Sequence, residues 1–63
     1  MKLDVTLKPC VTWRNGYAFG VVTANKDGQC VWNKNIRIAR MTREDALHDA
    51  QELINDILAL TSL

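Results

Sequence analysis

The chain has 63 residues, of which 48% are hydrophobic and 24% charged, and it carries a formal net charge of +1 at pH 7. A chain of this length forms at most one domain with a small core, so we expect a single domain over residues 1–63, and this composition excludes the disordered and fibrous classes. Charged or polar residues interrupt every apolar run well before the roughly 18 residues of a membrane-spanning helix, so we expect no contact with a membrane.

The N-terminal run, in which Leu3, Val5 and Leu7 alternate with polar residues, is typical of a β-strand. Pro9 is compatible with this strand because a strand at the edge of a sheet does not need every backbone N–H group. The run reaches past the end of its predicted partner, and three arrangements are open. It extends the hairpin, forms a fourth strand or pairs with another chain.

The first turn is predicted from Asn15-Gly16, which lies between two runs rich in strand-forming residues. Both residues accept a positive φ, so this pair is typical of a two-residue type I′ turn. The resulting register sets Arg14 opposite Tyr17. One face of the hairpin then carries Val11, Trp13, Ala18, Gly20, Val22 and Ala24, whose small members allow a helix to approach closely.

The second turn, within Asn25-Lys26-Asp27-Gly28, is predicted from the alternation of side chains. A two- or four-residue loop would place Asn33 and Arg37 on the face covered by the helix. A three-residue loop, residues 26–28 with Gly28 in the left-handed conformation, directs the apolar side chains of the next strand there instead. We therefore predict the three-residue loop. The side chains it directs under the helix are Cys30, Trp32, Ile36 and Ile38.

The last third of the chain is predicted to be a helix, because its apolar residues recur at helical spacing. Thr42 is a favourable N-cap, Asp45 three residues later completes a capping box, and acidic residues suit the first turn of a helix. The apolar stripe consists of Ala46, Leu47, Ala50, Leu53, Ile54, Ile57 and Leu58.

These elements predict an α+β fold in which a three-stranded antiparallel β-meander packs one face against a C-terminal α-helix, in the order βββα. An extra N-terminal strand is compatible with this fold. The expected core comprises Val11, Trp13, Ala18, Val22, Cys30, Trp32, Ile36, Ile38, Leu47, Ala50, Ile54 and Ile57.

Charge is divided between the two ends of the chain. Residues 1–43 contain all eight basic residues against two acidic ones, a net charge of +6, whereas residues 44–63 contain five acidic residues and no Lys or Arg. Four of these carboxylates follow helical spacing beside the apolar stripe, and we expect them to face solvent. This acidic ridge comprises Asp45, Asp49, Glu52 and Asp56.

A single helix covers one face of the sheet, so the opposite face stays open. On the predicted register Tyr17 and Phe19 of the central strand lie between Arg14 and Arg37 of its neighbours, within cation–π reach. Exposed aromatic residues beside Arg are typical of interfaces, so this face is expected to bind a second copy, another protein or nucleic acid. The alternative without a partner is ordinary cross-strand packing on a half-exposed sheet. This face is predicted to carry Thr12, Arg14, Tyr17, Phe19, Val21, Thr23, Val31, Asn33, Asn35 and Arg37.

The width of the helix stripe indicates self-association. Leu53 and Leu60 on one edge and Leu58 on the other make the stripe wider than one narrow sheet needs. Chains this short often gain stability by oligomerising, so we expect a homodimer.

No catalytic, cofactor or metal site is predicted. No metal-ligand motif brings Cys10, Cys30 and His48 together, and the sequence contains no phosphate-binding glycine motif. His48 lies four residues from Glu44 and from Glu52, a spacing that is typical of a surface ion pair on a helix. We therefore predict a protein that is not an enzyme and takes no cofactor, metal or small-molecule substrate. The two cysteines are too few for a disulfide framework, and we expect no apolar leader at the N-terminus. Both observations favour a cytoplasmic protein.

Several short motifs between residues 14 and 53 resemble the N-terminal arm-type DNA-binding domains of lambdoid phage integrases. They are Arg-Asn-Gly-Tyr at 14–17, Lys-Asp-Gly at 26–28, Arg-Ile-Ala at 37–39 and the helix start Thr-x-x-(Asp/Glu)-Ala at 42–46. That family lays its three-stranded sheet into the DNA major groove. The resemblance therefore implies groove contacts from Arg14, Tyr17, Lys34 and Arg37. HicB-type antitoxins and other small prophage-encoded proteins are similar in the Gly-Tyr strand and the helix start.

The leading hypothesis is a small interaction module of phage or prophage type that binds and modulates another protein, as an accessory factor or inhibitor. It would act through the open sheet face or through the acidic ridge. The alternative is a module that binds double-stranded DNA with the sheet, and a third reading is a structural subunit of a larger assembly. The residues predicted to contact the partner or DNA are Arg14, Tyr17, Phe19, Lys34, Arg37 and Arg40.

Overall fold

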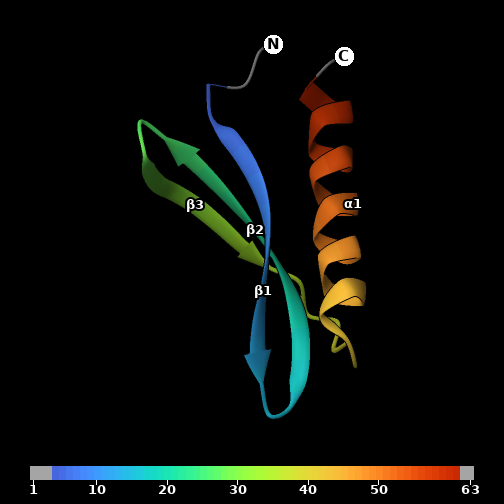
Figure 1. Ribbon diagram of the computed structural model, residues 1–63. Helices are drawn as coiled ribbons and strands as arrows, with labels where there is room; N and C mark the ends of the chain where they lie inside the picture. Colours follow the sequence, from blue (N-terminus) through green and yellow to red (C-terminus); the bar gives the residue numbers. More distant parts are fainter. Residues whose placement is uncertain (1–3, 62–63) are drawn as a thin grey trace.

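The computed structural model describes residues 4–61 and confirms the predicted α+β architecture (Figure 1). The elements follow the order βββα and are β1 (Thr6–Arg14), β2 (Tyr17–Lys26), β3 (Gln29–Asn35) and α1 (Arg43–Thr61). The sheet is antiparallel with strand order β1-β2-β3, and α1 packs on one of its faces.

The first hairpin forms as predicted. Asn15 and Gly16 have φ values of 52° and 81°, which is the pair of positive angles that a type I′ turn requires. Arg14 lies opposite Tyr17, and pairing continues without interruption to Thr6 opposite Asn25. Of the three arrangements open for the N-terminal run, the structure shows an extension of the hairpin, while Leu3 lies outside the described residues.

The second turn differs from the prediction. Lys26 pairs with Gln29, so the loop has two residues, and Asp27 and Gly28 have φ values of 53° and 80°. Asp tolerates a positive φ nearly as well as Asn does, so Asp-Gly forms the same kind of turn as Asn-Gly. A β-bulge at Val31 then changes which side chains of β3 face the helix. Asn25 pairs with Cys30 but Ala24 pairs with Trp32, so Val31 is the extra residue between the two pairs.

The helix begins where the capping residue predicts. The backbone N–H of Asp45 donates to Thr42 Oγ1 at 3.2 Å, and the N–H of Ala46 donates to the Thr42 carbonyl at 3.3 Å. Glu44 and Asp45 occupy the first turn, where the helix dipole favours negative charge. Among residues 4–61 there is no helix long and apolar enough to cross a membrane.

The core is small because helix and sheet meet through small residues. At Gly20 of β2 an added Cβ would lie 2.5 Å from the carbonyl oxygen of Ala46 and 3.1 Å from the backbone nitrogen of Ala50, so only glycine permits this approach. Leu7, Ile36, Leu53 and Ile57 pack around the buried centre. The buried apolar residues are Ala18, Val22, Ala24, Ala46, Ala50 and Ile54.

Four residues predicted for the core are exposed instead: Trp13, Cys30, Trp32 and Ile38. Cys30 precedes the bulge and pairs with Asn25, so its side chain lies on the same face of the sheet as that of Asn25, away from the helix. Trp32 is on the helix side, but α1 packs on β1 and β2 only, and no Cα atom of α1 lies within 8 Å of one in β3. The remaining eight residues predicted for the core lie inside the fold. Ala18, Val22, Ala50 and Ile54 are buried, and Val11, Ile36, Leu47 and Ile57 are half-buried.

Candidate interaction surfaces

The sheet has one face without a helix, called the open face below, as Figure 1 shows. Register and alternation assign its members, because Ala18, Gly20, Val22 and Ala24 of β2 are buried on the other side. The open face consists of Thr6, Lys8, Cys10, Thr12 and Arg14 of β1, Tyr17, Phe19, Val21, Thr23 and Asn25 of β2, and Cys30, Asn33 and Asn35 of β3.

The centre of the open face is aromatic. Arg14 Cζ lies 5.0 Å from the centroid of the Phe19 ring, which confirms the predicted cation–π contact between diagonal neighbours. Tyr17 is 44% exposed, and Phe19 and Val21 are half-buried between the flanking strands. Lys8, absent from the predicted contact set, also lies here, and the register of the first hairpin alone would have found it.

Three of the six predicted contact residues, Lys34, Arg37 and Arg40, lie away from the open face. Lys34 pairs with the buried Val22, so it belongs to the helix side of the sheet. Arg37 was predicted to lie on the open face, but β3 ends at Asn35 and Arg37 follows in an irregular segment that leads to α1. The structure therefore groups Arg14, Tyr17 and Phe19 and separates Lys34 and Arg37 from them.

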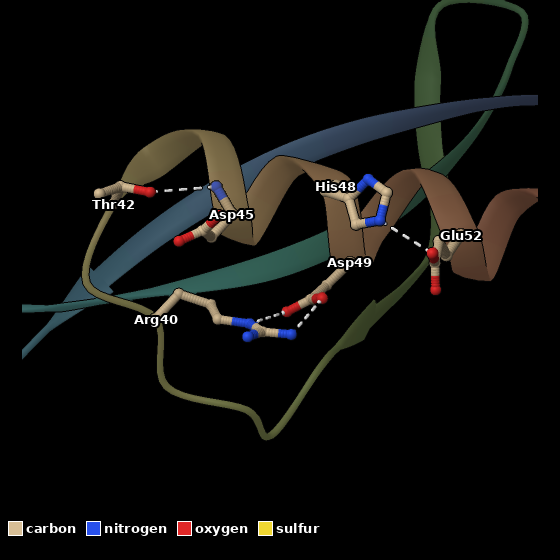
Figure 2. Close-up of polar contacts among 6 residues, drawn as sticks. All are labelled: Arg40, Thr42, Asp45, His48, Asp49 and Glu52. Atoms are coloured by element: carbon tan, nitrogen blue, oxygen red, sulfur yellow. Dashed lines mark hydrogen bonds and ion pairs between the residues drawn. The ribbon is translucent and has the colours of Figure 1, made fainter.

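Arg40 is engaged with the helix (Figure 2). Its Nε donates to Asp49 Oδ2 at 2.7 Å and its Nη2 donates to Oδ1 at 2.8 Å. This bidentate bond holds the pKa of Asp49 below its usual value, and the same bond raises the pKa of Arg40. A guanidinium with both of these donors committed is poorly placed to contact phosphate.

The acidic ridge is only partly exposed. The Asp49 side chain is 9% exposed and paired with Arg40, which corrects the expectation that the whole ridge faces solvent. Asp45, Glu52 and Asp56 are exposed. Glu52 is joined to His48 at 2.8 Å, as the spacing predicted, and Figure 2 shows this pair on the outer side of the helix.

A groove of about 390 Å³ runs between the segment after β3 and α1, and it carries both signs of charge. Lys34 and Arg37 line it together with Glu52, Asp56 and Asp49, the last of which is already paired with Arg40. The charges that the sequence divides between its two ends are therefore brought together along this groove, so neither sign dominates it.

A second groove, of about 330 Å³, is lined entirely by apolar side chains. Sequence reasoning missed it because the bulge at Val31 and the uncovered side of β3 create it. We call it the apolar groove. Its lining residues are Val5, Leu7, Ala24, Val31, Trp32 and Ile57.

Within residues 4–61, no three His, Cys, Asp or Glu side chains gather in a way that would hold a metal ion. The described surfaces thus offer aromatic, apolar and mixed-charge contacts. No model of a protein family matches this chain, and no curated protein or solved structure is similar enough to it to match.

Proposed function

We propose that this chain is a small non-enzymatic interaction module that binds another protein through the open face. The observation that carries the proposal is the composition of that face. Arg14, Tyr17 and Phe19 form an aromatic and cationic centre, and uncharged Thr and Asn side chains surround it. Tyr and Arg are enriched at the centres of protein interfaces, where they contribute most of the binding energy, and such interfaces have polar rims.

The charge of the open face supports a protein partner more than DNA. Among the described residues of this face, the cations are Lys8 and Arg14. Affinity for duplex DNA depends on the number of phosphates neutralised, with a log–log salt slope of about −0.9 for each. Two cations correspond to a slope of about −2, which is weak binding. DNA binding by Arg14, Tyr17 and Phe19 remains the alternative function.

A module without a catalytic site would act by occupying a surface of its partner. That mode of action fits an accessory factor or an inhibitor, and the resemblance to small prophage-encoded proteins supports a phage or prophage setting. The acidic ridge supports this proposal less, because Asp49 is already paired with Arg40.

The experiment is affinity capture from nuclease-treated lysate of the native host, comparing three forms of the chain. The test variant is Arg14→Glu/Tyr17→Ser, which changes two exposed residues of the open face. The matched control is Arg43→Glu/Leu58→Ser, which makes the same kinds of change at exposed positions of α1. Circular dichroism checks that each variant is folded.

The proposal predicts at least one protein that the unchanged chain and the control retain and the test variant loses. Loss by both variants, or by neither, would contradict it. Fluorescence anisotropy with a labelled duplex at two salt concentrations tests the alternative. Salt-dependent binding that the test variant abolishes would support DNA as the ligand of the open face.

A further inference from the structure

Arg14 lies over an aromatic ring of the open face and has no anionic partner there. Its Cζ atom is 5.0 Å from the centroid of the Phe19 ring. The ring attracts the positive charge but has no oxygen or nitrogen atom to accept the N–H groups of the guanidinium. Within residues 4–61, no carboxylate lies within ion-pair distance of Arg14. Its N–H groups are therefore available to a group from outside the chain.

The other cation of the open face has different surroundings. Lys8 lines a small polar pocket together with Asp27, so a carboxylate of the chain itself lies near it. Arg14 is six residues from Lys8 along β1, about 20 Å at the rise of an extended strand. Among the described residues assigned to the open face there is no Asp or Glu. Arg14 is thus a cation among aromatic and uncharged side chains.

This placement limits what can cover the open face. A protein that packs on Phe19 also has to cover the guanidinium that lies over the ring. Covering it removes water from its N–H groups, and a charge that is buried without an opposite charge is strongly unfavourable. The chain contributes no carboxylate at this place within its described residues, so the covering surface has to supply the anion.

The chemistry of Arg14 favours a carboxylate over a phosphate group. A guanidinium is planar and presents its N–H groups in pairs that match the two oxygens of a carboxylate. Arg40 and Asp49 show this geometry within the chain, with hydrogen bonds of 2.7 and 2.8 Å. A phosphorylated side chain carries about two negative charges at pH 7, which one guanidinium does not balance. Tyr17, opposite Arg14 and 44% exposed, offers a hydroxyl donor on the same face.

We propose that the protein bound by the open face presents an Asp or Glu side chain that pairs with Arg14. This inference rests on the proposed function, because the pair forms only when a protein covers the face. Phe19 holds the guanidinium over the sheet, and the guanidinium donates two parallel hydrogen bonds to the carboxylate. The occupant is therefore an acidic segment of the partner, and surfaces that bring a cation to this place are rejected.

The first test varies position 14 alone. The probe is the protein that the unchanged chain retains in the capture experiment above, produced in pure form, and the dissociation constant is measured by titration calorimetry. Arg14→Gln, which removes the charge, should raise the dissociation constant roughly 30-fold or more. Arg14→Lys keeps the charge without the paired N–H groups and should recover only part of that loss. The control Arg43→Gln, at an exposed position of α1, should leave the constant unchanged.

The second test exchanges the two charges. Photo-crosslinking from position 17 locates the partner segment that lies on the open face, and each Asp and Glu of that segment is replaced by Arg in turn. One of these partner variants should bind the Arg14→Glu chain at least roughly 10-fold more tightly than the unchanged partner does, because the pair forms again with its signs reversed. Circular dichroism checks that every variant is folded.

The acidic contact and the proposed function fail in different ways. If Tyr17→Ser weakens binding and Arg14→Gln does not, the open face binds a protein but the acidic contact is wrong. If neither weakens binding, or if no protein is retained, both proposals fail. The acidic contact is also overturned if no charge exchange restores binding. Loss of binding after phosphatase treatment of the partner would overturn it too, because the anion would then be phosphate.

Discussion

Arg40 and Asp49 join three parts of the fold through one residue pair. The Arg40 side chain donates two hydrogen bonds to Asp49 of α1, at 2.7 and 2.8 Å. The Arg40 backbone exchanges two hydrogen bonds of 2.8 Å with Ala18 at the start of β2. The irregular segment after β3 is thereby held against both the sheet and the helix.

This pair predicts a specific acid sensitivity. Because Arg40 lowers the pKa of Asp49 in the folded state below its ordinary value of 3.8, the unfolded state binds the proton more readily. The pair therefore adds stability above about pH 4, and this contribution is lost as the pH falls through the lowered pKa of the folded state. Arg40→Gln should reduce stability at neutral pH and remove this part of the acid sensitivity.

Urea midpoints measured at about pH 6 and at about pH 3 would test the prediction, because this interval contains the ordinary pKa of Asp49. Arg43→Gln, at an exposed position of the first helical turn, is the control and should keep the acid sensitivity of the unchanged chain. An Arg40→Gln protein that loses as much stability on acidification as the unchanged chain would contradict the assignment.

Gly20→Ala tests the close approach of helix and sheet. The new methyl group would meet the backbone of Ala46 and Ala50, which cannot move aside as a flexible side chain would. We expect a loss of at least about 2 kcal/mol in the free energy of unfolding, measured with urea. A change below about 0.5 kcal/mol would mean that the helix lies farther from β2 than described.

Asp27 tests the corrected second turn. Its φ of 53° is required by the two-residue loop, whereas the three-residue loop places only Gly28 in the left-handed conformation. Asp27→Ala should therefore cost about 1 kcal/mol, whereas Asp27→Asn should be nearly neutral, because Asn tolerates the left-handed conformation. Thermal unfolding of the two variants side by side gives the comparison. Equal effects would favour a right-handed conformation at Asp27 and the three-residue loop.

Thr42 tests the start of the helix. Its Oγ1 accepts the Asp45 N–H, so Thr42→Ala should lower stability by about 1 kcal/mol, while Thr42→Ser retains an acceptor and should stay close to the unchanged chain. Helix content and urea midpoint are the two readouts. If Ser and Ala were equally destabilising, the hydrogen bond would not be the source of the effect.

Local patterns account for the parts of the fold that were predicted. Asn15-Gly16 sets a turn and hence a register over the whole first hairpin, and Thr42 marks the helix start. The prediction of the second turn was wrong because it assigned the change of alternation to the loop, whereas the bulge at Val31 in β3 supplies that change. A bulge of this kind has no strong local signature.

The site was predictable where it depends on the first hairpin and not where it depends on the path of the chain after β3. Arg14, Tyr17 and Phe19 follow from the register, and the structure brings them together. Arg37 was misplaced because the strand ends two residues earlier, at Asn35. The pairing of Arg40 with Asp49 depends on a tertiary contact between an irregular segment and α1, which periodicity does not encode.

The central claim, that the open face binds a protein, is tested most directly in living host cells. Replacing Tyr17 by the photo-crosslinking residue benzoylphenylalanine keeps an aromatic ring at an exposed position in the open face. Leu58, exposed on α1, is the control position for the same replacement. We predict a light-dependent adduct between position 17 and a protein of different sequence, which position 58 does not form. An adduct only to nucleic acid, only to a second copy, or none at all would contradict the account.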